Sequence, residues 1–170
     1  KKICDIGSGK GFLLREELKK QPRSVTAVDI ATNYLKQFDY ENVDRIVANA
    51  ENLPFENEFE IAVSTDVLEH VLNVGSFMYS VNKILKDGGL FLVRVPYKEN
   101  LLQYGKQNGP PYPFTHLRTY DVDLLKHQVE QAGFRPVKVA FDGFQSGYPR
   151  AFFQSGIGKL IFKKLVFDRY

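Results

Sequence analysis

The sequence has 170 residues, of which 44% are hydrophobic, enough for one compact domain with a sizeable core and too few for two ordinary domains. Its 23 basic and 20 acidic side chains leave a formal charge of +3, far from the one-sided charge of a dedicated nucleic-acid binder. One cysteine cannot form an intrachain disulfide, and no signal peptide or apolar run near the roughly 18 residues of a membrane span is visible. We therefore expect a cytoplasmic protein with no nucleic-acid partner.

Apolar runs of strand length alternate with stretches of helical period along the chain, which is the pattern of a parallel sheet covered by helices. We expect an α/β fold: a three-layer, Rossmann-like, doubly wound sheet of seven mostly parallel strands with helices on both faces, in a single domain over 1–170. The predicted strands are 2–6, 24–29, 45–48, 60–65, 90–95, 134–141 and 148–154. The predicted helices are 10–21, 32–39, 74–86, 121–132 and 156–170.

Two segments fall outside the simple alternation. Residues 97–119 combine aromatic side chains with proline and glycine, so we expect a long loop inserted over the acceptor side of the domain. The helix predicted over 156–170 is basic and amphipathic; it could touch a membrane surface, but we expect it to cover the sheet edge. Since residues 1–4 already have the pattern of a buried strand, we expect an N-terminal segment of a longer protein to be missing.

A glycine loop, Gly7-Ser8-Gly9-Lys10-Gly11, directly follows the first predicted strand and precedes a predicted helix. Glycine lets a ligand approach the backbone and allows a positive φ, so this spacing favours a ligand-binding loop. The dinucleotide fingerprint would need glycine in place of Phe12, and the phosphate-binding loop would need serine or threonine directly after Gly-Lys. Neither pattern fits. Asp29 ends the second predicted strand, where it could accept the ribose hydroxyls of an adenosine or, alternatively, cap a helix.

Four motifs, in order over the range 1–95, resemble those of class I S-adenosylmethionine-dependent methyltransferases. They are the Asp-x-Gly-x-Gly-x-Gly run from Asp5 to Gly11, the acidic Asp29, the segment 49–55 and Leu68-Glu69-His70. Segment 49–55 is similar to the Asp-Ala-Glu-x-Leu-Pro-Phe of the branch that includes ubiquinone-biosynthesis C-methyltransferases (methyltransferase type 11). The likeness thins after Pro96 to a His-x-Arg element at 116–118 and Ala-Gly-Phe at 132–134.

The resemblance implies that S-adenosylmethionine is the cofactor, with the glycine loop around its methionine part, Asp29 on its ribose and position 49 on its adenine amine. The chain has Asn49 where the family has aspartate; the amide oxygen can still accept a hydrogen bond but brings no charge. The implied cofactor-binding residues are Asp5, Gly7, Ser8, Gly9, Gly11, Asp29, Ile30, Asn49, Ala50, Glu51, Thr65 and His70.

We expect methyl transfer to a small-molecule acceptor. An acceptor that must lose a proton needs a base, and His116 and His70 are the candidates. Alternatively, His70 orients the cofactor loop and His116 is a loop residue bonded to backbone. We expect no metal. The alternative function is a non-catalytic module that binds S-adenosylmethionine or S-adenosylhomocysteine within a larger assembly, and a nicotinamide-dependent oxidoreductase is third. The oligomeric state is not predicted.

Overall fold

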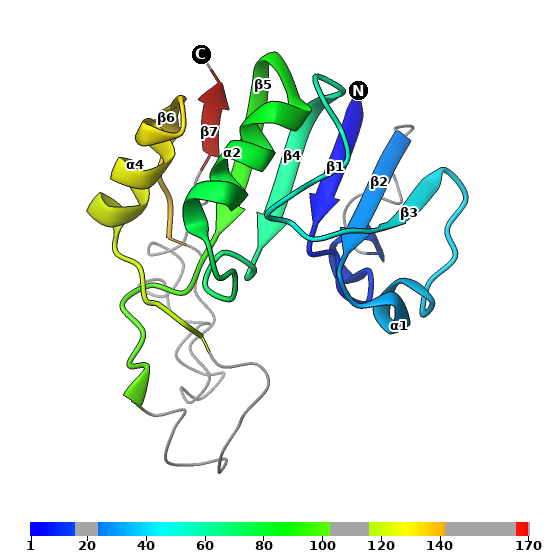
Figure 1. The fold of residues 1–170 in the computed structure, drawn as a ribbon, viewed down its shortest axis with the longest axis horizontal. Helices are drawn as coiled ribbons and strands as arrows, with labels where there is room; N and C mark the ends of the chain where they lie inside the picture. Colours follow the sequence, from blue (N-terminus) through cyan, green and yellow to red (C-terminus); the bar gives the residue numbers. More distant parts are fainter. Residues whose placement is uncertain (16–23, 103–115, 142–165, 170) are drawn as a thin grey trace, which may run out of the picture.

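The structure is a computed structural model that describes residues 1–15, 24–102, 116–141 and 166–169. These residues form one seven-stranded sheet in the order β3-β2-β1-β4-β5-β7-β6 (Figure 1). The strands are β1 (Lys2–Ile6), β2 (Ser24–Asp29), β3 (Val43–Val47), β4 (Phe59–Thr65), β5 (Leu85–Arg94), β6 (Phe134–Lys138) and β7 (Val166–Arg169). The helices are α1 (Thr32–Leu35), α2 (Val74–Ile84) and α4 (Val122–Gln131). The predicted α/β sheet fold is confirmed.

Pairing within the sheet is parallel from β3 to β5, while β7 runs antiparallel to both of its neighbours. The central strand β1 is buried from Ile3 to Ile6 because both faces of the sheet are covered there. On one face, a large apolar cluster includes side chains of α2 and α4, such as Phe77 and Leu125. On the other face, a smaller cluster contains Leu14 and Leu35.

The last strand corrects the sequence analysis. Residues 166–169, predicted as the end of a helix, form β7 between β5 and β6. A strand at this position hydrogen-bonds to both neighbours, and this pairing outweighs the helical spacing of the apolar residues. The prediction of a helix is therefore wrong for these residues, and with it the expectation that such a helix covers the sheet edge or touches a membrane surface there. The rest of that helix and the strand predicted at 148–154 lie outside the described residues.

Other boundaries differ by a few residues. Helix α1 ends at Leu35 instead of Asp39, β6 ends at Lys138 instead of Phe141, and β3 begins at Val43. Of the helix predicted over 10–21, the structure describes a helical start at 12–15, and of the loop 97–119 it describes both ends. Within the described parts of the chain, no helix is long and apolar enough to cross a membrane.

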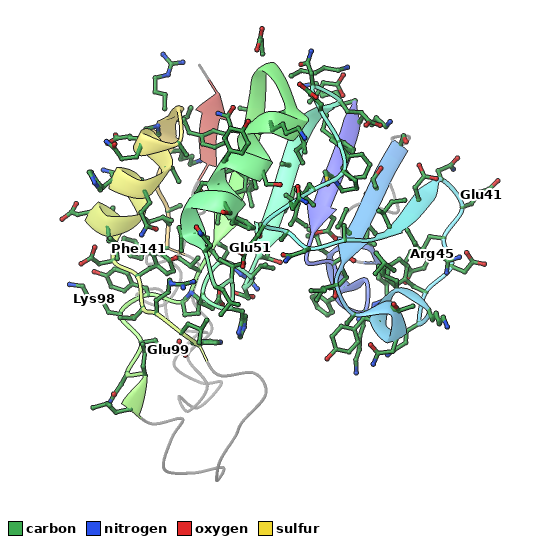
Figure 2. The ribbon with its side chains drawn as sticks, viewed as in Figure 1. Glu41, Arg45, Glu51, Lys98, Glu99 and Phe141 are labelled. Carbon is green, nitrogen blue, oxygen red and sulfur yellow. The ribbon has the colours of Figure 1, made fainter. Side chains whose placement is uncertain are left out.

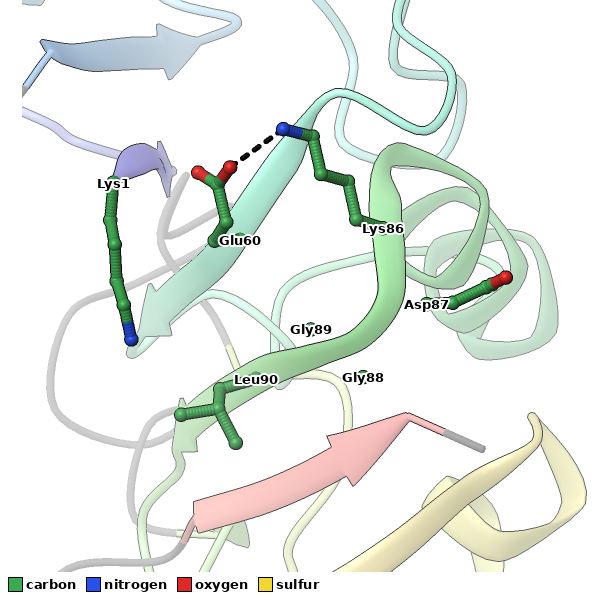
Figure 3. A pocket seen from close by; sticks show the side chains of 7 residues that line it. All are labelled: Lys1, Glu60, Lys86, Asp87, Gly88, Gly89 and Leu90. Carbon is green, nitrogen blue, oxygen red and sulfur yellow. Dashed lines mark hydrogen bonds and ion pairs between the residues drawn. The ribbon is translucent and has the colours of Figure 1, made fainter.

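The junction between α2 and β5 lies at the amino-terminal edge of the sheet. Helix α2 ends at Ile84, and β5 begins directly at Leu85 with an irregular register opposite Phe59. Gly88, at φ 70°, has the left-handed backbone conformation that glycine adopts without strain. A pocket at this turn is lined by residues 86–90 together with Lys1 and Glu60 (Figure 3).

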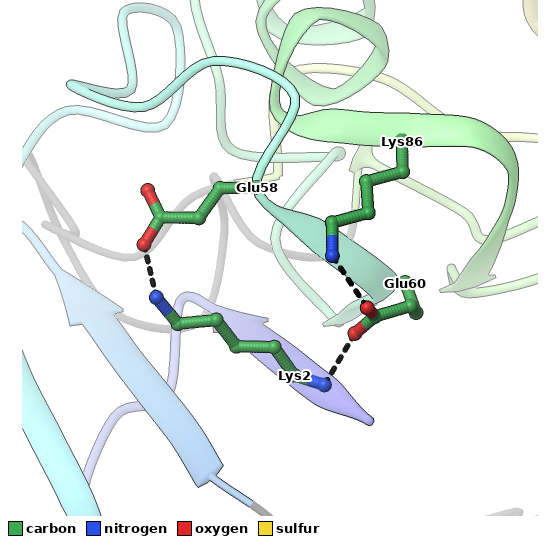
Figure 4. A network of polar contacts seen from close by, with 4 residues as sticks. All are labelled: Lys2, Glu58, Glu60 and Lys86. Atoms are coloured by element: carbon green, nitrogen blue, oxygen red, sulfur yellow. Dashed lines mark hydrogen bonds and ion pairs between the residues drawn. The ribbon is translucent and has the colours of Figure 1, made fainter.

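Charged side chains surround that junction. Lys86 Nζ lies 2.6 Å from Glu60 Oε1, and Lys2 pairs with Glu58 and donates its backbone N–H to Glu60 (Figure 4). The hydrogen bond from Lys86 holds the pKa of Glu60 at about 2. Such exposed pairs contribute little to stability. None of the predicted site residues lies here, since they follow the carboxyl ends of the strands at the opposite edge.

Candidate functional site at the carboxyl edge of the sheet

The glycine loop between β1 and the following helical turn has three glycines with positive φ: 72° at Gly7, 53° at Gly9 and 74° at Gly11. A Cβ at Gly7 would lie 2.2 Å from Val67 Cγ2, and one at Gly11 would lie 2.7 Å from Phe38 Cδ1. A Cβ at Gly9 would meet no atom within 4 Å. The outer two glycines are therefore required by packing, whereas the backbone at Gly9 borders open space.

Asp29, at the end of β2, holds the glycine loop in place. Asp29 Oδ2 accepts a hydrogen bond from Gly9 N at 2.8 Å, and Oδ1 accepts one from Ala31 N at 2.8 Å. Gly7 N and Ser8 N both donate to Val28 O, at 2.8 and 3.0 Å. Each carboxylate oxygen has a further lone pair, so Asp29 can still accept a hydroxyl. The sequence predicts the hydroxyl contact but not this support of the loop.

Two polar side chains, Asp5 of β1 and Ser8 of the loop itself, have buried atoms without a partner among the described residues. Asp5 is 2% exposed and its Oδ2 is unsatisfied, as is Oγ of the buried Ser8. Burial, and then the nearby Asp29 carboxylate, raise the pKa of Asp5 to about 7. Unsatisfied buried polar atoms are rare in folded proteins, so their presence in and next to the loop supports a ligand-binding role for it.

The segment after β3 forms a tight turn rather than an open loop. Asn49 Oδ1 accepts from Glu51 N at 2.9 Å, and Leu53 N donates to Ser80 Oγ of α2 at 2.7 Å. Glu51 Oε1 accepts from Leu72 N at 2.8 Å, which ties this segment to the turn after β4 (Figure 2). Asn49 is exposed, and one of the two lone pairs of its amide oxygen is in use.

The turn after β4 brings two more predicted residues beside the glycine loop. Val67, which a Cβ at Gly7 would strike, accepts a hydrogen bond from His70 N at 2.9 Å. Thr65 ends β4 and is half-buried, and the carboxylate of Asp66 pairs with Arg94. Ile30, on the other side of the loop, is 69% exposed. Glycine loop, Asp29 and His70 therefore belong to one edge of the sheet.

His70 and His116, far apart in sequence, lie together. Their ring centroids are 4.6 Å apart at an interplanar angle of 79°. His116 Nδ1 hydrogen-bonds to Glu99 Oε2, which lies on the segment after β5 (Figure 2). Ligand atoms of Glu69, His70 and His116 all lie within 4.8 Å of one another. The sequence predicts both histidines but neither their contact nor the partner Glu99.

Glu69 is fully buried in this cluster. Both of its carboxylate oxygens lack a hydrogen-bond partner among the described residues, and burial raises its pKa to about 7. Its backbone O accepts from Leu117 N at 2.9 Å, which links the turn after β4 to the segment that carries His116. The motif Leu-Glu-His contains the signal for Glu69, whereas Glu99 has none in the sequence.

Arg118 fixes the same turn from outside. Its guanidinium donates to the backbone oxygens of Leu68 at 2.9 Å, of Val71, and of Leu72 at 3.2 Å. Three carbonyls at the end of a turn are thus satisfied by one planar donor group. The sequence shows the His-x-Arg element but not this role. The positions of Glu69 and His70 consequently depend on the segment that precedes α4.

Comparisons with known proteins agree with this geometry. Rat "Arginine-hydroxylase NDUFAF5, mitochondrial" is 30% identical over 164 residues, covering 87% of this chain and 46% of that protein. A ubiquinone biosynthesis O-methyltransferase of Paramagnetospirillum magneticum is 33% identical over 97 residues, covering 53% of this chain and 38% of its own. The chain thus spans about half or less of the length of these relatives.

The fold recurs in solved structures. The complex of the Haloferax volcanii Trm112 methyltransferase activator with a methyltransferase contains a chain that matches with a TM-score of 0.75 at 14% identity, covering 99% of this chain and 81% of that one. Residues 1–139 match the family described as "Methyltransferase domain". This match includes the glycine loop, Asp29, segment 49–55 and both histidines. The chain therefore belongs to the methyltransferase domain family.

Proposed function

We propose that this domain transfers a methyl group from S-adenosylmethionine to a small-molecule acceptor. The observation that carries the proposal is the glycine loop: Gly7 and Gly11 are closed by packing, whereas Gly9 borders open space and Asp29 fixes its amide. A backbone prepared in this way suits a ligand that lies against it. The buried, unsatisfied atoms of Asp5, just before the loop, and of Ser8, within it, support the same assignment.

On the cofactor side, each residue has a distinct task in the proposal. The loop from Gly7 to Gly11 lies against the methionine part, and Asp29 accepts the ribose hydroxyls with its remaining lone pairs. Asn49 offers its second lone pair to the adenine amine, and Ala50 offers backbone contact. The Glu51 carboxylate, already bonded to Leu72 N, holds the segment after β3 against the turn after β4.

On the methionine side, Thr65 ends β4 and His70 follows it, and both lie beside the cofactor's reacting end. On the adenosine side, the exposed Ile30 follows Asp29 and offers an apolar surface. When bound, the cofactor would supply a methyl group on a sulfonium sulfur, which would leave as a neutral thioether. The protein must then chiefly align an acceptor with that methyl.

For an acceptor hydroxyl, His116 has the arrangement of a general base. Glu99 accepts a hydrogen bond from the Nδ1 side of the ring, so Nε2 is the atom that would take the acceptor's proton. The oxygen gains the methyl, the sulfonium sulfur keeps the electron pair of the broken bond, and the proton stays on the imidazole. His70, in contact with the same ring, orients it.

The test is a mass-spectrometric search for products of the full-length protein, incubated with methyl-labelled S-adenosylmethionine and a cell extract. We expect a small molecule that gains one labelled methyl group, and we expect Asp29→Ala to abolish it. Binding of S-adenosylhomocysteine without any methylated product would instead support the alternative, a non-catalytic binding module. A product that gains one oxygen atom would match the activity for which the rat relative is named.

Location and partners stay predictions. We propose a cytoplasmic protein that acts on a small molecule. We expect no nucleic-acid partner, because the basic and acidic charges of the chain are nearly balanced. The mammalian relatives are named as mitochondrial proteins. Fluorescence microscopy of the tagged full-length protein distinguishes the two compartments.

A further inference from the structure

We propose that Glu69, His70 and His116 bind a divalent first-row transition-metal ion of the zinc class. The three side chains come from two segments, the turn after β4 and the segment before α4. The proposal does not depend on methyl transfer, because it rests on the ligand atoms, on the burial of Glu69 and on the contact between His116 and Glu99.

The spacing of the ligand atoms suits one ion. They lie within 4.8 Å of one another, whereas two ligands of a tetrahedral zinc ion, at about 2.0–2.2 Å from the metal, lie about 3.4 Å apart. To reach the spacing of zinc ligands, two ligand atoms must approach each other by about 1.4 Å or less. Small rotations of side chains suffice for that, since His70 and His116 already meet edge to face.

Burial supplies the second observation. Glu69 is 0% exposed, and neither of its carboxylate oxygens has a hydrogen-bond donor among the described residues. The nearby Arg118 donates to the backbone oxygens of Leu68, Val71 and Leu72. A buried carboxylate without a partner is unfavourable, and a metal cation within reach of its oxygens would satisfy it.

Glu99 supplies the support that metal-binding histidines usually have. A ligating imidazole generally donates its other ring N–H to a carboxylate or carbonyl, which fixes the tautomer and the orientation of the ring. His116 has this arrangement: Nδ1 bonds to Glu99 Oε2, so Nε2 is the ring atom that would bind the ion. Glu99 is thus a positioning residue and not a ligand.

The ligand chemistry selects the ion. Two imidazoles and one carboxylate suit zinc, cobalt or iron, whereas magnesium prefers oxygen ligands. Asp66, whose carboxylate pairs with Arg94, is an exposed residue and is not needed as a ligand. Three protein ligands leave a coordination position open, where an acceptor oxygen or water could bind and lose its proton more readily. With the ion bound, His116 would be a ligand, and the ion would replace it in activating the acceptor.

The experiment uses the full-length protein without a histidine tag, freed of metal with a chelator and titrated with Co²⁺, then with Zn²⁺. We expect one equivalent of Co²⁺ to give the d–d absorption of a Co²⁺ ion with a low coordination number. Zn²⁺ should then displace the bound Co²⁺. His116→Ala and Glu69→Gln should abolish the absorption, and Glu99→Gln should weaken Co²⁺ binding about 10- to 100-fold. His127→Ala is the matched control, because His127 is exposed on α4. It should bind Co²⁺ as the unmodified protein does.

Binding of S-adenosylhomocysteine, measured on each variant, shows that a variant is folded and separates this proposal from the proposed function. The metal proposal would be overturned by the absence of stoichiometric Co²⁺ binding in a protein that binds S-adenosylhomocysteine. Co²⁺ binding that survives both His116→Ala and Glu69→Gln, or equal affinity for Mg²⁺ and Zn²⁺, would also overturn it.

Discussion

Gly9 and Gly88 offer a matched pair of substitutions at the residue scale. Both have positive φ, and a Cβ on either would meet no atom within 4 Å, but they lie at opposite edges of the sheet. Gly9→Ala and Gly88→Ala should each cost about 1–2 kcal/mol of stability, because an L-residue is strained in this conformation. Calorimetry should show that Gly9→Ala weakens S-adenosylhomocysteine binding at least about tenfold, whereas Gly88→Ala leaves it unchanged. Equal affinities would mean that the cofactor does not lie against Gly9.

Asp5 carries a prediction about pH. Since burial raises its pKa to about 7 in the folded protein, the folded state holds a proton that the unfolded chain releases near pH 4. This contribution to stability therefore declines as pH rises from about 4 to 7 and is constant above that range. Asp5→Asn should remove the part of the decline that Asp5 causes, a gain on the order of 2–4 kcal/mol at pH 8 and little at pH 4, whereas the part due to the buried Glu69 should remain.

Urea denaturation at a series of pH values measures this effect. Asp44→Asn, at an exposed position of β3, is the control and should leave the pH profile of stability unchanged. A profile of Asp5→Asn parallel to that of the unmodified protein would show that Asp5 does not titrate in this range.

Residues of the site differ in how far the sequence predicts them. The spacing of Gly7, Gly9 and Gly11 predicts a ligand-binding turn because positive φ is a local requirement that glycine meets. The same spacing cannot separate the packed glycines from the one beside open space, since Val67 and Phe38 come from distant segments. The role of Glu99 likewise cannot be predicted from the sequence, because only the fold brings Glu99 to His116.

At the scale of elements, the bond between Ser80 of α2 and Leu53 joins the segment after β3 to a rigid helix. Ser80→Ala would leave the buried Leu53 N–H without its acceptor, at a cost of roughly 1–3 kcal/mol. We also expect weaker S-adenosylhomocysteine binding, because Asn49 and Ala50 lie in the segment that is released. Thermal unfolding and calorimetry measure the two effects.

Ser76→Ala is the matched control on the same helix, because residue 76 donates to Asn73 Oδ1 with its backbone N–H, which alanine keeps. It should change neither the melting temperature nor the affinity appreciably. If Ser80→Ala behaved like Ser76→Ala, the anchoring of this segment by α2 would be refuted.

Element types follow from the sequence better than element ends. Strand β2 has the predicted bounds, because a buried apolar run ends there at Asp29. Helix α4 begins one residue after the predicted start because the Asp121 side chain caps it by accepting from Leu124 N. At the other extreme, 85–89 has the composition of a turn and contains the left-handed Gly88, but β5 already begins at Leu85. The pairing of Leu85 with Phe59 is a long-range contact that no local pattern contains.

At the scale of the whole molecule, β7 joins β6 to the rest of the sheet. The helical spacing of the apolar residues near the C-terminus conceals this strand, since the place between β5 and β6 exists only in the assembled sheet. Phe167→Pro should remove a backbone donor in a strand paired on both sides and destabilise the protein by at least roughly 1–3 kcal/mol.

The edge strand β6 provides the comparison. It already contains Pro136, and Val137 lies at an irregularity where the register with β7 shifts. Val137→Pro should therefore lower the melting temperature less than Phe167→Pro. The reverse order in thermal unfolding would contradict the placement of β7 between β5 and β6.

We infer that the cofactor binds at the carboxyl edge of the sheet, against the glycine loop. A titration of ¹⁵N-labelled protein with S-adenosylhomocysteine, followed by amide chemical shifts, tests it most directly. We predict that the shifts concentrate at Gly7–Gly11, Asp29–Ile30 and Asn49–Glu51, while the amides of the pocket at residues 86–90 on the opposite edge stay unchanged. Shifts centred on 86–90, or no shifts at millimolar ligand, would contradict the account.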